Sequence, residues 1–379
     1  MKVPLSSPDI IEKDIEAVVG VMKTRFLSIG PKVVEFEKRI SSFSGTKYAV
    51  AVNSGTSALH LIIRGMGIGE GDVVVTTPFS FIASSNCILF ERGRPLFVDI
   101  KEDTLNLDAD KVEEKLESLS REELAKVKAL LVVDAFGQPA DWGRFRQIGK
   151  KYNLRLIEDS AEALGAEYKG KRAGSLGEVG VFAFYPNKQI TTGEGGILVT
   201  DDKELARVAR SMRSQGRGEN GEWLDHERLG YNFRMDELSS ALGCSQMERI
   251  EEILDKRKAV ARMYGEKLAE IEEVEVPFVS PDTTKMSWFV YVVRLKKEID
   301  RNKVIKYLNE EGVQCKPYFT PIHLQTFYRK LFGYREGDFP ITEDVSSRTI
   351  ALPFFTNLKE EQIDYVVEKL RKGIYEEIF

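Results

Sequence analysis

The sequence has few cysteines and few histidines, and this scarcity argues against two kinds of protein. Only three of the 379 residues are cysteine and three are histidine. The cysteines, Cys87, Cys244 and Cys315, are far apart, form no CxxC pair and have no histidine cluster nearby. A disulfide-stabilised fold and a structural zinc site are therefore not expected, and we assign no metal ligands.

The chain also lacks long apolar runs and blocks of basic residues. No apolar run approaches the roughly 20 residues that a membrane-spanning helix needs. The net charge is −5, with no cluster of lysine and arginine that would bind nucleic acid. The beginning, MKVPLSSPDIIEKDIEAVV, shows no export or organelle-import pattern. We expect a cytoplasmic protein without membrane or nucleic-acid partners.

What is present is a globular composition with alternating strand and helix patterns. Apolar residues make up 42% and charged residues 30% of the chain. Short β-branched or apolar runs, each followed by a segment with helical spacing, recur in KYAVAVNSG, DVVVTTP, PLFVDI, VKALLVVDAFG and NLRLIEDSAEALG. This alternation predicts an α/β fold with a mainly parallel sheet and helices on both faces. Ligands of such sheets bind at the carboxyl ends of the strands.

The length and a change of pattern predict two domains. A chain of 379 residues exceeds what one core usually organises. Residues 230–271 read as one or two long, charged amphipathic helices, and the strands and helices beyond them are fewer and smaller. We therefore expect a large domain over residues 1–250 and a smaller α+β domain over residues 251–379.

The stretch NSGTSAL, residues 53–59, follows the first strand and opens a helix. The chain turns on Gly55, and the first helical turn offers the hydroxyls of Thr56 and Ser57. Free N–H groups at a helix start bind anions, most often phosphate. Taken alone, the stretch is more typical of an ordinary helix cap.

Two further residues give this stretch a chemical context. Asp159 ends an apolar strand, where it would face the ligand crevice or cap a following helix. Lys188 lies in VFAFYPNKQITTGEGGILVT, between an apolar strand and a glycine-rich turn. A lysine buried there would have a lowered amine pKa and could attack an aldehyde. A nucleophilic lysine, a carboxylate for a ring nitrogen and a phosphate site together are what pyridoxal phosphate requires.

With these residues the sequence resembles the DegT/DnrJ/EryC1/StrS family of sugar aminotransferases, which are fold-type I pyridoxal phosphate enzymes. The motifs that carry the resemblance cover almost the whole chain: SIGPKVVEFEKRISSFSG, NSGTSALHL, PFSFIASSNCILFERGRPLFVDI, FGQPAD, EDSAEALGA, FAFYPNKQITTGEGG, GYNFRMDELSSALG, YFTPIH and FPITEDVSSRTIALPFF.

The resemblance implies how the cofactor would be held. Lys188 would form the Schiff base and shuttle protons, and Asp159 would pair with the pyridinium nitrogen. The other residues with implied cofactor contacts are Gly55, Thr56 and Ser57 at the phosphate, Phe81 stacked on the ring, Glu162 near the phenolic oxygen, and Asn232, which reaches the phosphate of a neighbouring subunit. A homodimer with shared active sites follows.

The resemblance also implies which residues contact the substrate, and the sequence departs from the family's pattern at one position. His323 would face the sugar, and Tyr185, where other members have histidine, would affect substrate fit. Many members have a serine that binds the cofactor phosphate where this chain has Ala183. One phosphate hydrogen bond is therefore missing or replaced.

The implied reaction is transfer of an amino group from L-glutamate to a keto group of a nucleotide-linked sugar. The GEGG ending of the lysine loop is similar to members that act at C4 rather than C3. Related dehydratases carry histidine in place of Lys188, which argues against their chemistry. The alternatives are an aminotransferase for a keto-inositol and a regulatory protein that binds pyridoxal phosphate without turnover.

Overall fold

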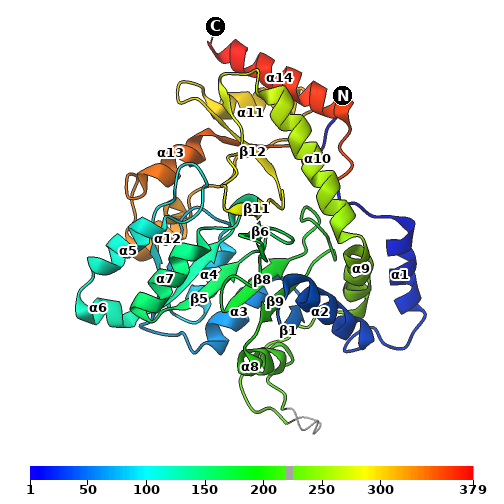
Figure 1. The fold of residues 1–379 in the computed structure, drawn as a ribbon, viewed down its shortest axis with the longest axis vertical. Coiled ribbons are helices and arrows are strands. Elements are labelled where there is room, and N and C mark those ends of the chain that lie inside the picture. Colours follow the sequence, from blue (N-terminus) through cyan, green and yellow to red (C-terminus); the bar gives the residue numbers. More distant parts are fainter. Residues whose placement is uncertain (219–224, 379) are drawn as a thin grey trace.

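The computed structural model describes residues 1–218 and 225–378. Helices and strands alternate along the first two thirds of the chain, as Figure 1 shows. The helices are α1 (Glu12–Met22), α2 (Pro31–Ser44), α3 (Gly55–Gly65), α4 (Ala83–Phe90), α5 (Ala109–Glu117), α6 (Arg121–Lys126), α7 (Trp142–Tyr152), α8 (Lys203–Arg213), α9 (Glu237–Glu248), α10 (Ile250–Leu268), α11 (Arg301–Glu310), α12 (Thr326–Phe332), α13 (Pro340–Arg348) and α14 (Glu360–Ile378), with short 3-10 turns η1 (Ala135–Gly137) and η2 (Ile322–Leu324).

A seven-stranded sheet forms the centre of the large domain. Its strands are β1 (Tyr48–Val52), β2 (Val73–Thr76), β3 (Arg94–Phe97), β4 (Val127–Val133), β5 (Arg155–Asp159), β8 (Val179–Ala183) and β9 (Gly196–Thr200), and their spatial order is β1-β9-β8-β5-β4-β2-β3. From β8 to β3 every pair is parallel, whereas β9 is antiparallel to both neighbours. The segment between β8 and β9 contains no helix that could cross the sheet, so these strands form a hairpin.

Both faces of this sheet are covered by helices, which confirms the expected α/β class. Because side chains alternate along a strand, Val50 and Val52 face α3 and α8. Ala49 and Ala51 face the opposite way, toward α2 and α9. The face that Ala49 and Ala51 share continues along the sheet to β4 and β2. There the helices α5 and α7 cover it with apolar side chains.

The C-terminal part of the chain builds a second core around a smaller sheet. One sheet has the order β10-β12-β13, formed by β10 (Val274–Glu275), β12 (Tyr291–Leu295) and β13 (Thr349–Leu352). Another pairs β11 (Thr283–Lys285), β6 (Glu167–Tyr168) and β7 (Lys171–Arg172).

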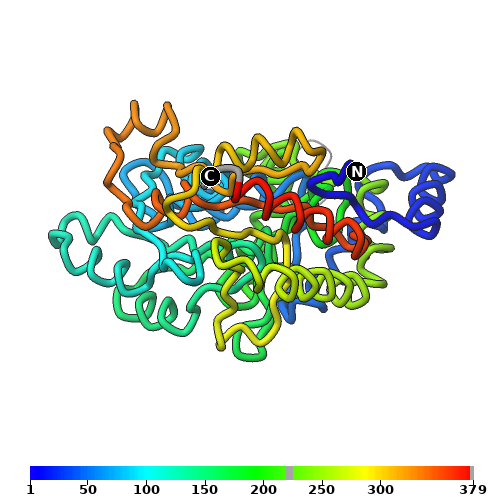
Figure 2. The backbone as a smooth tube through the Cα atoms, turned by 90° about the horizontal axis from the view of Figure 1, so that it is seen from above, coloured from blue at the N-terminus to red at the C-terminus, as the bar shows by residue number. Residues whose placement is uncertain are grey.

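Helices α10, α11 and α14 and the N-terminal Val3 pack on β12 and β13. The N-terminus lies beside α14 in both Figure 1 and Figure 2, and the Val3 N–H donates to the Gly312 carbonyl. A division of the domains at residue 250 stays a prediction.

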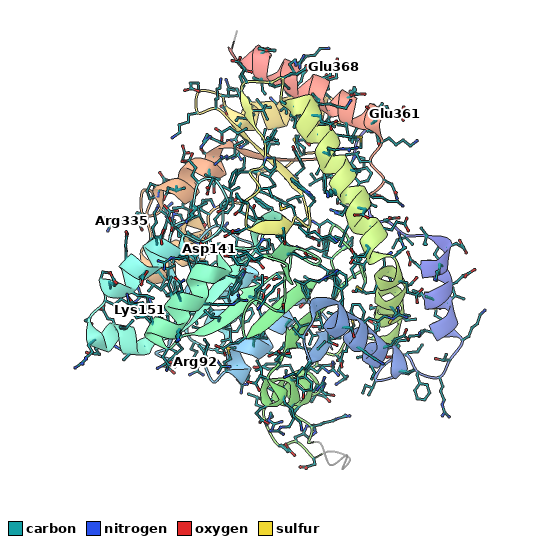
Figure 3. All side chains as sticks on the ribbon, viewed as in Figure 1. Arg92, Asp141, Lys151, Arg335, Glu361 and Glu368 are labelled. Atoms are coloured by element: carbon teal, nitrogen blue, oxygen red, sulfur yellow. The ribbon has the colours of Figure 1, made fainter. Side chains whose placement is uncertain are left out.

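Charged side chains such as Lys151, Arg335 and Glu368 point outward from the fold (Figure 3). Within residues 1–218 and 225–378, no helix is both long enough and apolar enough to cross a membrane. The cytoplasmic location stays a prediction.

Candidate active site

Lys188 lies on the hairpin connection between β8 and β9. Its N–H donates to the Tyr185 carbonyl at 2.9 Å, which closes a turn. The side chain is 12% exposed, and its Nζ lies 3.6 Å from Glu162 Oε1 and 3.9 Å from the centre of the Phe289 ring. Burial lowers the pKa of the Lys188 amine, while the carboxylates of Glu162 and Asp159 oppose this effect. A larger fraction of neutral, nucleophilic amine results.

Asp159 is the last residue of β5, and its side chain is buried among hydrogen-bond donors. Its Oδ2 accepts from the Ser84 hydroxyl at 2.7 Å, and its Oδ1 accepts from the Ala161 N–H at 3.2 Å. Burial raises the pKa of Asp159, against the lowering effects of these bonds and of the Lys188 charge. Residues 160–166 form turns, so Asp159 caps no helix. It is a buried carboxylate beside Lys188.

Glu162 provides a second buried carboxylate near the lysine. Its Oε2 accepts from the Phe136 N–H at 2.9 Å, and its Oε1 faces Lys188. Burial raises the pKa of Glu162, and the Lys188 charge opposes this. The Gln189 side chain donates to the Glu162 carbonyl at 2.6 Å, so the lysine loop is fastened to the segment that carries Glu162.

The stretch at residues 53–59 folds as the sequence indicates, with Ser54 as the cap of α3. The Ser54 hydroxyl accepts from the Ser57 N–H at 3.1 Å, and the Ser57 hydroxyl donates to Asn53 Oδ1 at 2.7 Å. In the described part of the chain, no acceptor is found for the N–H groups of Gly55 and Thr56. These two groups point out of the helix start and can receive an anion.

Small residues let the start of α3 lie directly against the hairpin of Lys188. A Cβ added to Gly196 on β9 would come 2.3 Å from the backbone of Ser54, so only glycine fits there. A Cβ on Gly55 would meet the Cβ of Ala183 at 2.9 Å. Ala183 is thus next to the free N–H groups, at the position where a hydroxyl could reach the same anion.

Three of the implied contact residues have exposed side chains: Phe81, Tyr185 and Asn232. Phe81 is 63% exposed and Tyr185 is 53% exposed, although both are large aromatic side chains. Asn232 is also exposed, on a segment that pairs with residues 52–53 and 214. The structure leaves these side chains accessible to a ligand or a second subunit.

His323 is placed differently from the other implied site residues. Its side chain has no exposed surface, its Nε2 contacts Glu343 Oε1 at 3.0 Å, and it packs against Phe339. Within the described residues its Nδ1 has no hydrogen-bond partner. In this conformation His323 is enclosed by its neighbours and is not accessible to a ligand.

Two residues that contact the site were not identified from the sequence. Ser84 comes from the first turn of α4 and holds Asp159, and Phe289 comes from the second domain and covers the Lys188 amine. Ser84 lies inside a segment that carries the family resemblance, which is the one signal that could have pointed to it. Phe289 precedes an ordinary apolar strand, and only the packing of the domains brings it to the lysine.

The described residues fit pyridoxal phosphate. The site combines a buried lysine of lowered pKa, a buried carboxylate at a strand end and two free N–H groups at a helix start. Lys188 would hold the aldehyde carbon, Asp159 the ring nitrogen, and Gly55 and Thr56 the phosphate. Such a set can bind an aldehyde and move a proton with one lysine.

Comparisons with known proteins agree with a site for pyridoxal phosphate. The sequence model of the DegT/DnrJ/EryC1/StrS aminotransferase family matches residues 8–371. GDP-perosamine synthase of Caulobacter vibrioides is 36% identical over 373 residues, which cover 97% of each chain. Spore coat polysaccharide biosynthesis protein SpsC of Bacillus subtilis is 35% identical over 381 residues, covering 97% of this chain and 96% of that one.

A solved structure extends the similarity to three dimensions. Helicobacter pylori PseC, an aminotransferase involved in the biosynthesis of pseudoaminic acid, superimposes with a TM-score of 0.92 at 28% identity, covering 99% of this chain and 100% of that chain. The match therefore covers the seven-stranded sheet, the Lys188 hairpin and the smaller C-terminal sheet. The chain belongs to the DegT/DnrJ/EryC1/StrS aminotransferase family and is a pyridoxal phosphate-dependent aminotransferase.

Proposed function

We propose that this enzyme transfers the amino group of L-glutamate to a ketone at C4 of a nucleotide-linked sugar. The observation that carries the proposal is the similarity to GDP-perosamine synthase along nearly the whole chain, including the second domain. The lysine hairpin with its GEGG ending supports C4 over C3. The amino donor is proposed from the family resemblance.

Lys188 and Asp159 would divide the proton chemistry between them. When bound, pyridoxal phosphate supplies an aldehyde that captures amines and a ring that withdraws electrons from the neighbouring carbon. The neutral Lys188 amine would be the base that takes the proton from the donor's α-carbon and the acid that gives a proton back. Asp159 would hold a protonated ring nitrogen, because the hydrogen bonds from Ser84 and Ala161 stabilise its carboxylate form.

The remaining contacts would hold and orient the cofactor. Gly55 and Thr56 would bind the phosphate through their N–H groups, and Ser57 would add its hydroxyl only by giving up its hydrogen bond to Asn53 Oδ1. Phe81 would stack on one face of the ring, and its exposed aromatic side chain is free to do so. Glu162 lies beside Lys188 and would face the phenolic oxygen.

A second copy of the chain would complete the site. Asn232 is exposed and would reach the phosphate bound by the partner subunit. An apolar surface near the N-terminus supports a dimer, because its side chains are 39–65% exposed: Ile11, Ile15, Val19, Met22, Phe26, Leu27 and Ile29. Four of them, at positions 11, 15, 19 and 22, follow one side of α1 and its start.

The sugar would enter where Tyr185 is exposed. Tyr185 lies on the lysine loop and is half-exposed, so we propose that it contacts the sugar. His323 could join it only after the side chains packed on it, Phe339 and Tyr334, separate.

Product analysis tests the proposal. The purified chain with pyridoxal phosphate and ¹⁵N-labelled L-glutamate is offered GDP- or UDP-linked 4-keto-sugars, the matching 3-keto-sugars and a keto-inositol. We expect the label at C4 of a nucleotide sugar, located by mass spectrometry and NMR. Labelled amine at C3 or on the inositol would contradict the acceptor, and binding without any 2-oxoglutarate release would favour the regulatory alternative.

A further inference from the structure

Asp134, Ser160 and Glu158 form a buried cluster at the carboxyl ends of β4 and β5, here called the proton-sharing triad. None of the three side chains is exposed. The Ser160 Oγ lies 2.7 Å from Asp134 Oδ2 and 2.6 Å from Glu158 Oε1. Two of these residues, Glu158 and Ser160, are the sequence neighbours of Asp159.

These distances fix the number of protons in the triad. Both oxygen–oxygen contacts have the length of a hydrogen bond, so each needs a hydrogen atom. The Ser160 hydroxyl supplies one hydrogen, and an ionised carboxylate supplies none. The second hydrogen must therefore belong to one of the two carboxyl groups. One of Asp134 and Glu158 is a neutral carboxylic acid.

Glu158 has the environment of the ionised member. Its Oε2 accepts from the N–H groups of Leu176 at 2.7 Å and Gly177 at 2.9 Å. Its Oε1 accepts from the Gly174 N–H and from Ser160. Each oxygen of Glu158 thus faces two donors, which suits a carboxylate and leaves no acceptor for a proton of its own.

Asp134 has the environment of the neutral member. Its Oδ1 accepts from the Ala140 N–H and from Trp142 Nε1, each at 2.9 Å, whereas its Oδ2 faces only the Ser160 hydroxyl. A proton on Oδ2 can therefore donate to Ser160, which in turn donates to Glu158. Burial, and next the charge of Glu158, raise the pKa of Asp134 well above its usual value.

We propose that Asp134 is a neutral carboxylic acid at neutral pH and that the proton-sharing triad is a positioning device for Asp159. The Asp134 N–H donates to the Asp159 carbonyl at 3.0 Å, so the triad holds Asp159 through its carbonyl and through both adjacent residues. Its value for catalysis rests on the proposed role of Asp159 in the reaction. The proton assignment itself does not depend on that role.

Infrared spectroscopy of the full chain tests the proton directly. With ¹³C-labelled aspartate at pH 7, we expect the carbonyl stretch of a protonated carboxylic acid, and we expect Asp134→Asn to lose it. Asp99→Asn is the matched control: burial raises the pKa of Asp99, but hydrogen bonds from Thr342 and Ile341 hold it below its usual value. A band that survives Asp134→Asn would overturn the assignment.

Amide substitutions test the same assignment by stability. An amide at position 134 can replace the neutral acid, because it accepts on one side and donates to Ser160. An amide at position 158 places an NH₂ group against N–H donors. We expect Glu158→Gln to lower the melting temperature by about 5 °C and Asp134→Asn by less than about 2 °C. Equal losses would contradict the proposal.

Hydrogen exchange tests the positioning of Asp159 without requiring turnover. We expect Asp134→Ala to speed exchange in peptides that cover residues 157–163, and Asp134→Asn to restore protection. Faster exchange in both variants, or in neither, would overturn the positioning role. Failure of the proposed reaction would leave all three measurements intact, so the two proposals fail separately.

Discussion

Replacing Ser84 by alanine is expected to change how the rate of the glutamate half-reaction depends on pH. The acid limb of the pH–rate profile should move to higher pH. The Ser84 hydroxyl donates to Asp159 Oδ2 at 2.7 Å, and the Ser80 hydroxyl lies 2.8 Å behind it. Both serines are buried, so water does not readily replace the lost hydroxyl. The bond favours the ionised form of Asp159, which is the form that can hold a protonated ring nitrogen.

The size and sign of the shift follow from this bond. A hydrogen bond to a charged group contributes about 1.5–3 kcal/mol net, and one pKa unit corresponds to about 1.4 kcal/mol. Removing the bond destabilises the carboxylate by about this free energy and raises the pKa of Asp159. As pH falls, the Ser84→Ala enzyme therefore loses activity earlier than the wild type does.

The assay follows the visible band of the bound cofactor as L-glutamate bleaches it in a single turnover, across a pH series. Ser85→Ala is the matched control, because Ser85 is equally buried on α4 but makes no hydrogen bond to Asp159 in the described structure. An unmoved acid limb in Ser84→Ala, or an equal movement in Ser85→Ala, would refute the reasoning.

Three further substitutions have expected outcomes. Ala183→Ser should tighten pyridoxal phosphate binding by about 3- to 10-fold, because it adds a hydroxyl beside the anion site, and a weaker binding constant than that of Ala183→Gly would contradict this. Glu162→Gln should lower the pKa of the Lys188 amine further, since it removes the carboxylate whose charge opposes the lowering by burial. Reductive methylation of the cofactor-free protein across a pH series measures this pKa. An unchanged or raised pKa would argue against the ion pair. Gly196→Ala should lower both the melting temperature and cofactor affinity, because its Cβ would meet the Ser54 backbone at 2.3 Å; unchanged values in calorimetry and binding would count against the tight approach.

The sequence supports prediction of the fold and of the residues at strand ends. Strands that alternate with helices must run parallel, so the carboxyl ends of β1 and β5 meet at one edge of the sheet. Asp159 and the start of α3 could be placed there before any coordinates. Lys188 could be placed because a glycine-rich turn between two apolar strands brings its backbone to the same edge.

Other parts of the site depend on packing that no local pattern shows. Ser84 reaches Asp159 across 75 residues of sequence, from a helix whose serines look like ordinary polar positions. Phe289 reaches Lys188 only because the second domain packs against the sheet. His323 lies in a motif that carries the resemblance, yet an aromatic cluster and Glu343 enclose it.

Lys188 is expected to bind pyridoxal phosphate and to carry out the amino transfer. The most direct test is the visible absorption spectrum of the purified chain with added pyridoxal phosphate, before and after L-glutamate, in the wild type and in Lys188→Ala. We expect a yellow band that depends on Lys188, bleaches with glutamate and releases 2-oxoglutarate. A band that never forms, or that forms and bleaches equally well without Lys188, would contradict the account.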